Sequence, residues 1–170
     1  MAGGSADLGE AQGWNNAATL RYFIKDPSTG FDDILAFGAP GVFVTTGQNP
    51  ATHGGEPFGR LYLAMDDFGS NQGWSVDQTP RIVGDVNGDG IPDIVGFGAT
   101  STFAAIGSRD GGGNLHFALD TTRTIGDFGY AEGWSRSDPL TIRALGDVAG
   151  TGHSDLILSG AANTQVWQFQ

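Results

Sequence analysis

The chain contains no cysteine, so no disulfide framework can hold it together. Lysine and arginine number only 8, against 19 aspartates and glutamates, which gives a formal net charge of −11. Nucleic-acid phosphates and anionic membrane surfaces both require a basic patch, so this composition argues against either as a partner. It leaves open the binding of cations and of neutral ligands such as sugars.

Long hydrophobic runs are also missing. No apolar stretch approaches the ~20 residues of a membrane-spanning helix, so we expect no membrane insertion. No basic segment followed by an apolar one resembles a signal peptide. We therefore expect a leaderless chain, either cytoplasmic or secreted by a non-classical route, with residues 1–6 as a flexible leader.

Helix signals are absent, whereas turn signals are frequent. We find no capped segment with a 3.6-residue apolar period, so the sequence predicts no helix. Glycine accounts for 29 of the 170 residues and separates many short apolar runs. Such a pattern of short strands and tight turns predicts an all-β fold.

The chain repeats itself three times. Trp14, Trp74 and Trp134 stand 60 residues apart, and each closes a similar phrase. The phrases are DLGEAQGW (7–14), DFGSNQGW (67–74) and DFGYAEGW (127–134). In the third copy an insertion moves the later features by two residues, so that Asp155 follows Asp93 by 62. The predicted repeats are 7–66, 67–126 and a shorter 127–170.

Each repeat contains three or four short predicted strands bounded by Gly, Asn, Asp or Pro. The predicted strands are 20–25, 33–37, 41–46, 60–65, 81–86, 93–97, 102–106, 115–119, 141–147, 155–159 and 164–169. Repeats of about 60 residues with up to four strands are typical of β-propeller blades.

Blades must stack on neighbours to bury their faces, and propellers close with typically four to eight of them. Three blades would leave two sheet faces open, and the third repeat lacks a clear fourth strand, which another chain could supply. We therefore expect a homo-oligomer. Two chains would complete a six-bladed ring with two-fold symmetry, although other stoichiometries remain open.

The stretch DVNGDGIPDIVGFG (85–98) places four oxygen-bearing side chains just before an apolar run. Side-chain oxygens at positions 1, 3, 5 and 9 of a glycine-containing loop, with a backbone carbonyl at position 7, can converge on one Ca²⁺. The predicted calcium ligands are Asp85, Asn87, Asp89, the carbonyl of Ile91, and Asp93. The alternative interpretation is a turn whose carboxylates are only solvated.

The corresponding loops of the other repeats have lost ligands. Repeat 1 has a lysine at the first position, Lys25, whose charge would repel or replace Ca²⁺. Repeat 3 keeps Asp147 and Asp155 but has Ala149 and Thr151 between them, so we expect at best a weak second site there.

The stretch 85–98 resembles the FG-GAP/VCBS calcium repeat of integrin-type and microbial propellers. The longer phrase at 67–98 resembles the repeats of the PVL-like fungal lectins, the Psathyrella velutina lectin type, and the similarity extends over about 7–170. That resemblance implies a β-propeller with calcium in blade loops, and pockets between blades that bind terminal N-acetylglucosamine. Family members carry six or seven blades in one chain, whereas this chain carries about three.

Sugar sites commonly pair an aromatic face with a few polar groups. The residues that recur with the repeat, or stand near it, are therefore the candidates. They are Trp14, Trp74, Trp134, Asp7, Asp67, Asp127, Tyr130, Asn71, Arg81, His53 and His116. Two alternatives stay open: the tryptophans could pack within or between blades, and the aspartates could brace turns.

The leading functional hypothesis is a non-enzymatic, multivalent lectin for glycans with terminal N-acetylglucosamine. The alternative is a structural or adhesion module of the FG-GAP kind that binds a protein partner. We do not expect an enzyme, because the three histidines lie far apart in sequence, the G-x-S-x-G motif of hydrolases is missing, and loops and turns account for the carboxylates.

Overall fold

The computed structural model describes residues 8–15, 19–134 and 141–169, and it is all-β as expected. Its strands form three separate antiparallel sheets, which confirms the prediction of propeller-type blades. The chain divides into two compact units, Met1–Gly73 with Arg109–His116, and Trp74–Ser108 with Phe117–Gln170. In the described part of the chain, no helix is long and apolar enough to cross a bilayer.

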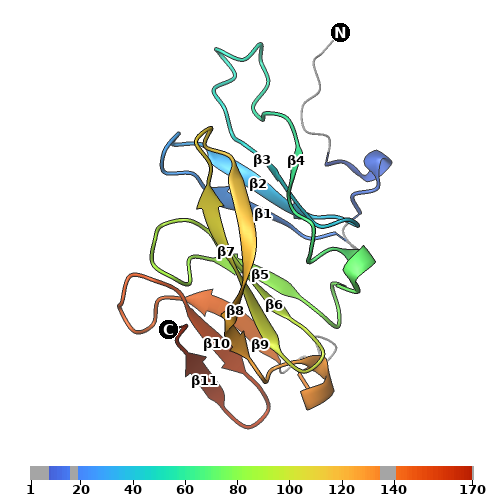
Figure 1. Ribbon diagram of the computed structural model, residues 1–170, viewed down its shortest axis with the longest axis vertical. Helices are drawn as coiled ribbons and strands as arrows, with labels where there is room; N and C mark the ends of the chain where they lie inside the picture. Colours follow the sequence, from blue (N-terminus) through green and yellow to red (C-terminus); the bar gives the residue numbers. More distant parts are fainter. Residues whose placement is uncertain (1–7, 16–18, 135–140, 170) are drawn as a thin grey trace. The chain divides into compact units, whose positions relative to one another are not determined.

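The first unit contains one four-stranded sheet, drawn in blue to green in Figure 1. Its strands follow one another in chain order as β1 (Arg21–Lys25), β2 (Asp32–Phe37), β3 (Val42–Thr45) and β4 (Tyr62–Met65). The buried residues of β2 and β3 include Leu35, Phe37, Val42 and Val44, so the central strands carry the core while β1 and β4 form the edges.

The second unit contains the other two sheets. One is built from β5 (Arg81–Gly84), β6 (Asp93–Phe97), β7 (Thr102–Arg109) and β8 (Leu115–Ile125), in chain order. The other has the order β11 (Thr164–Trp167), β10 (Asp155–Ser159), β9 (Ile142–Gly146), with three strands among the described residues. The tip of the β7–β8 hairpin, Arg109–His116, belongs to the first unit.

Every predicted strand overlaps an observed one, with β7 and β8 extending beyond the prediction. The extension is continuous across Ile106–Arg109, because this long hairpin carries its pairing past the point where the apolar alternation ends. The strand registers also confirm the repeat. Val95 pairs with Ala104, and Ile157, 62 residues after Val95, pairs with Val166.

The expectation of no helix was wrong in one respect. Each described copy of the recurring phrase contains a single turn of 3₁₀ helix: η1 (Glu10–Gln12), η2 (Ser70–Gln72) and η3 (Tyr130–Glu132). Each turn ends at a glycine in the left-handed conformation, with φ of 88° or 89°. A single turn has no 3.6-residue periodicity, so only the closing glycine signals it in the sequence.

The phenylalanine of the D-F-G triplet has an unusual backbone. Phe68 and Phe128 have φ of 62° and 69°, a region that L-residues rarely adopt, yet both are buried. The preceding aspartate stabilises this conformation, because Asp67 Oδ1 and Asp127 Oδ1 each accept the next residue's N–H at 2.6 Å. The ring reaches the core at the cost of local strain.

The core of the second unit joins its two sheets. Buried residues from β6, β7 and β10 form one cluster with Phe128 and Phe169, and Ile82, Trp134 and Leu145 pack around it. The sheets therefore stack through apolar faces, as blades of a propeller do.

We expect Gly129→Ala to destabilise the fold strongly. An added Cβ at Gly129 would overlap the backbone carbonyl of Ala99, and backbone cannot move aside cheaply. Gly133→Ala is the matched control, because φ is 88° there but nothing lies within 4 Å of the added atom. The control should lose about 1 kcal/mol of unfolding free energy from left-handed strain alone, and chemical denaturation should show a clearly larger loss for Gly129→Ala.

Candidate functional site

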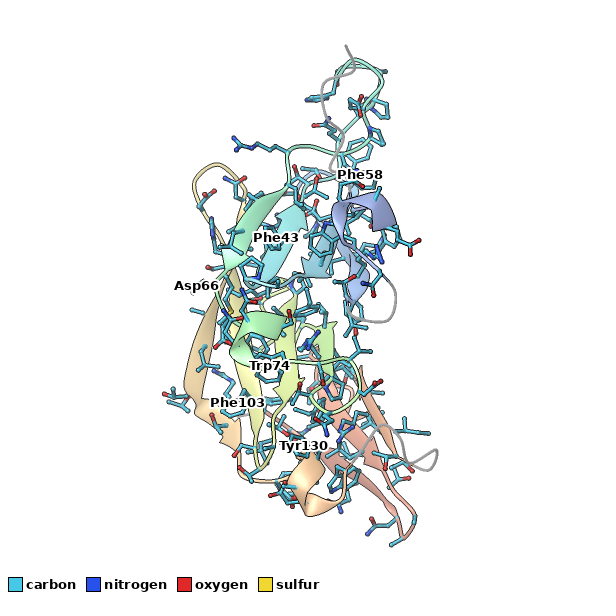
Figure 2. The ribbon with its side chains drawn as sticks, turned by 90° about the vertical axis from the view of Figure 1, so that its right-hand side faces the viewer. Phe43, Phe58, Asp66, Trp74, Phe103 and Tyr130 are labelled. Carbon is cyan, nitrogen blue, oxygen red and sulfur yellow. The ribbon has the colours of Figure 1, made fainter. Side chains whose placement is uncertain are left out.

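A groove of about 670 Å³ lies in the first unit, between β4 and the tip of the β7–β8 hairpin. It is lined by Phe43, Thr46, Arg60, Leu61, Tyr62, Leu63, Asp110, Asn114 and His116. Its volume is within the range typical of small-molecule sites, and it combines apolar walls with a few polar groups. Figure 2 shows Phe43 on the first sheet, beside this strand–hairpin junction.

Asp110 organises the hairpin tip. Its Oδ1 accepts backbone N–H groups from Gly112 at 2.8 Å and Asn114 at 2.9 Å, and Asn114 Nδ2 donates to Oδ2 at 3.0 Å. Hydrogen bonds from Asn114 and Gly112 hold the pKa of Asp110 well below its usual range. His116 Nε2 lies 3.3 Å from Asp110 Oδ2, which places the ring at the mouth of the groove.

Tyr62 joins the two sides of the groove. Its hydroxyl accepts the N–H of Leu115 at 2.8 Å and donates to the carbonyl of the same residue at 3.3 Å. Burial raises the pKa of Tyr62 above its ordinary value, so the hydroxyl remains protonated at neutral pH. The Tyr62 and His116 rings lie 6.1 Å apart, and together they form an aromatic wall.

Arg109 ties the hairpin to the first sheet from beneath. Its guanidinium lies 3.1 Å from Asp33 Oδ2 and 3.4 Å from Asp26 Oδ2, and it donates to the carbonyl of Gly113 at 2.8 Å. Both aspartates are buried, so this is an ion pair largely removed from water. Asp33 Oδ1 accepts the N–H of Gly47 at 2.9 Å, which leaves each oxygen of the carboxylate with a donor.

A second cavity of about 430 Å³ adjoins the same hairpin and shares Thr46 and Asn114 with the groove. His53, one of the predicted sugar ligands, lines this second cavity and not the groove. Its Nδ1 lies 3.0 Å from the carbonyl of Asn49 within an exposed loop. His116 is therefore the one predicted sugar residue that lines the groove.

The recurring tryptophans pack within the sheets. Trp14 meets Phe43 edge to face at a ring-centre distance of 5.6 Å, and Trp74 meets Phe103 at 6.2 Å. Trp74 and Phe103 are labelled in Figure 2. Trp134 packs at 5.3 Å against Phe128. These contacts support the packing interpretation of the tryptophans.

The repeated arginine has a structural place too. Arg81 is buried, and its Nη1 donates to the carbonyls of Ser75 at 3.1 Å and Thr79 at 3.2 Å. Arg21 bonds in the same way to the carbonyls of Leu8 and Trp14. The guanidinium thus fixes the loop around the recurring phrase.

The remaining predicted sugar residues lie away from the groove lining. Asp67 and Asp127 each bond to the next residue's N–H, as described above, which supports the turn-bracing interpretation. Asn71 and Tyr130 belong to the 3₁₀ turns and bond through their backbone N–H groups to Ala39 and Gly98. Asp7 lies outside the described residues.

The predicted calcium loop is wrapped by its own hydrogen bonds. Asp85 accepts N–H groups from Gly88 at 2.6 Å and Gly90 at 2.8 Å. Asn87 Oδ1 accepts from the N–H of Asp89 at 3.0 Å, and Asp89 Oδ1 accepts from Ile91 at 2.8 Å. Three exposed oxygen-bearing side chains thus share one short loop, a donor chemistry that fits Ca²⁺.

Asp93 has a different role from the rest of the predicted ligands. Its oxygens accept the N–H groups of Val86 and Gly107, each at 2.8 Å, inside the sheet. Burial raises the pKa of Asp93 to about 6; these hydrogen bonds oppose the shift, and the charges of Asp89 and Asp85 add to it. Within the described ranges, no three carboxylate or imidazole groups converge as a metal centre.

The loop of the third repeat keeps the same shape with fewer candidate ligands. Asp147 accepts N–H groups from Thr151 and Gly152, each at 2.9 Å. Asp155 Oδ2 accepts from Val148 at 3.0 Å and Ala149 at 2.9 Å. The first aspartate therefore wraps the turn even where the middle ligands are lost, so loop shape alone does not indicate a metal.

Sequence reasoning missed most of the groove: Arg60, Tyr62, Asp110 and Asn114 were not among the candidates. One signal was present in DGGGNLH (110–116), where an aspartate and an asparagine flank three glycines next to a histidine. Such a tight turn clusters polar side chains at a hairpin tip. What the sequence could not show is that Tyr62, 53 residues away, bonds to this tip.

Comparison with known proteins gives one clear likeness. No family model matches the chain, and no curated protein does. A solved lectin of Agrocybe aegerita, studied for its specific recognition of non-reducing terminal N-acetylglucosamine, superposes with a TM-score of 0.75. The two are 30% identical over 92% of this chain, which spans 36% of the lectin's length. The chain therefore has a fungal lectin-like fold.

Trp74→Ala should cost stability and leave ligand binding at the groove intact. Removing the ring takes away its edge contact with Phe103, and large-to-small changes of this kind typically cost about 3 kcal/mol or more. Tyr130→Ala is the control, because that side chain is exposed in the corresponding turn of the next repeat. Thermal unfolding should separate the two variants; a stable Trp74→Ala protein that has lost ligand binding would instead make Trp74 a binding platform.

Proposed function

We propose that this chain is a carbohydrate-binding lectin that recognises terminal N-acetylglucosamine in the groove beside the β7–β8 hairpin tip. The observation that carries the proposal is the likeness to the Agrocybe aegerita lectin, at 30% identity and a TM-score of 0.75. The groove supports it independently, because it combines aromatic walls with converging polar groups of the kind that sugars require.

The groove offers complementary chemistry for an N-acetylated sugar. Phe43, Leu61 and Leu63 supply apolar surface for the C–H face of a pyranose and for the acetyl methyl group. Asp110 accepts hydrogen bonds from hydroxyl groups, and Arg60 and Asn114 can donate to the amide carbonyl or to ring hydroxyls. The low pKa of Asp110 keeps its carboxylate an acceptor across the physiological pH range.

Binding without turnover accounts for these residues. The single histidine of the groove lies beside Asp110, whose oxygens already bond to the hairpin backbone. We therefore propose a lectin and not an enzyme. A glycan array tests the alternative of an adhesion module, because a protein-binding module would give no glycan signal.

We further propose that Asp85, Asn87, Asp89 and the carbonyl of Ile91 hold a stabilising Ca²⁺, with Asp93 bracing the loop from the sheet. Hard oxygen donors are what Ca²⁺ prefers. The crowding of Asp85 and Asp89 near the buried Asp93 is unfavourable without a cation. When bound, the ion would neutralise this charge and rigidify the loop.

We also propose that the lectin acts as a homo-oligomer, in the simplest case a dimer of three-bladed chains. Each copy would carry its own groove, and linked grooves gain avidity for clustered glycans.

His116→Ala should weaken binding of N-acetylglucosamine about tenfold, since a hydrogen bond and part of the aromatic wall are lost together. Isothermal titration calorimetry with the monosaccharide measures this directly. The matched control is His53→Ala, a histidine that lines the neighbouring cavity. Equal losses in both variants, or unchanged binding in His116→Ala, would rule out the groove as the sugar site.

Asp89→Ala should lower the Tm in calcium and leave it nearly unchanged in EDTA, because a ligand that binds only the folded state raises Tm by mass action. Thr151→Ala is the control, since it occupies the equivalent position of the third repeat. Differential scanning fluorimetry of both variants, with and without calcium, is sufficient. A calcium-independent effect of Asp89→Ala would leave the loop as a hydrogen-bonded turn only.

A further inference from the structure

Two sheets leave apolar side chains exposed at positions that are covered elsewhere in the repeat. Equivalent positions follow from the strand registers: Arg81 pairs with Gly96, and Arg143 pairs with Leu158, so residues of the second and third sheets correspond at a spacing of 62. The first and second sheets correspond at 60. These spacings allow the same face to be compared between sheets.

The face of the second sheet that packs on the third is fully buried. Val86 and Ala104 are both 0% exposed, in a cluster that includes Leu156 and Leu158 of β10. We call the equivalent surface of the third sheet the trailing face; it contains Val148 and Val166. These valines are 58% and 51% exposed. The same apolar positions are thus covered in one sheet and open in the next.

The opposite face shows the complementary pattern. In the contact between the second and third sheets, Leu145 of β9 lies against Gly84 of β5, so closely that a Cβ built on Gly84 would be 3.3 Å from Leu145 Cβ. Phe23 of β1 occupies the position of Leu145, and it is 75% exposed. We call this surface of the first sheet, with Phe23 and its paired neighbour Ile34, the leading face.

We propose that the trailing face of one copy binds the leading face of a second copy, head to tail. The contact repeats the one that the second and third sheets already make inside a single chain. Phe23 of the second copy would lie against Gly146, as Leu145 lies against Gly84. Val148 and Val166 would be covered in the same way as Val86 and Ala104.

This contact is heterologous, because two different surfaces meet. It deepens the proposed oligomer by naming its surfaces, and it does not depend on the identity of the sugar. Each copy carries a formal net charge of −11, so electrostatic repulsion opposes association. Salt screens such repulsion while leaving apolar burial intact, and we therefore expect added NaCl to strengthen the oligomer.

Cysteine cross-linking tests the pairing directly, because the chain has no cysteine of its own. A Cβ at Gly146 would meet only Ile157 Cδ1, at 3.4 Å, so Gly146→Cys should be tolerated. Phe23→Cys mixed with Gly146→Cys should form a covalent dimer on mild oxidation, since the expected Cβ separation is close to that of a disulfide. Neither variant alone should cross-link efficiently.

The matched control places the same geometry inside one chain. Gly84→Cys combined with Leu145→Cys should form an intramolecular disulfide at monomer mass, seen as loss of free thiol. Self-cross-linking of Phe23→Cys alone would mean an isologous contact and would overturn the head-to-tail arrangement. Absence of any cross-link in the mixture, with the control disulfide formed, would overturn it as well.

A second experiment distinguishes this inference from the proposed function. Val166→Asp should weaken association at least tenfold in sedimentation velocity, whereas Leu119→Asp, also an exposed apolar residue but on β8, should leave it unchanged. Val166→Asp should still bind N-acetylglucosamine at the groove. An unmodified chain that is folded and monomeric at all concentrations would overturn the interface, and sugar binding would then stand or fall separately.

Discussion

A buried carboxylate at the start of the second strand holds each sheet together. Asp33, Asp93 and Asp155 are all 0% exposed, and burying such a group is costly unless its oxygens find donors. In the second sheet both donors are backbone N–H groups from the preceding loop and from β7. The carboxylate thereby ties a turn to a strand 14 residues away, which gives the hairpin its shape.

The three sheets satisfy this requirement in different ways. In the first sheet the loop donor is replaced by the guanidinium of Arg109, which comes from the β7–β8 hairpin. In the third sheet Asp155 Oδ2 takes two loop N–H groups, and Oδ1 has no partner among the described residues. The repeat is therefore conserved as a set of positions, while the groups that complete each position have diverged.

The sequence predicted what is periodic and local. The strands were predictable because apolar runs alternate with turn residues, and the registers confirmed the 60- and 62-residue spacings. The single 3₁₀ turns were missed, since three residues carry no helical period. The tryptophans and Arg81 attracted attention because they recur, but recurrence reflects packing that every blade needs. The groove departs from the repeat, so repetition could not reveal it.

The position of Arg109 beside Asp110 joins the interior of the molecule to its groove. One residue holds the buried carboxylates of Asp26 and Asp33, and its neighbour arranges the polar groups of the hairpin tip. A change deep in the first sheet would thus shift the groove without altering any residue that lines it. Ligand preference in this fold can drift through interior electrostatics, out of reach of comparisons restricted to the binding surface.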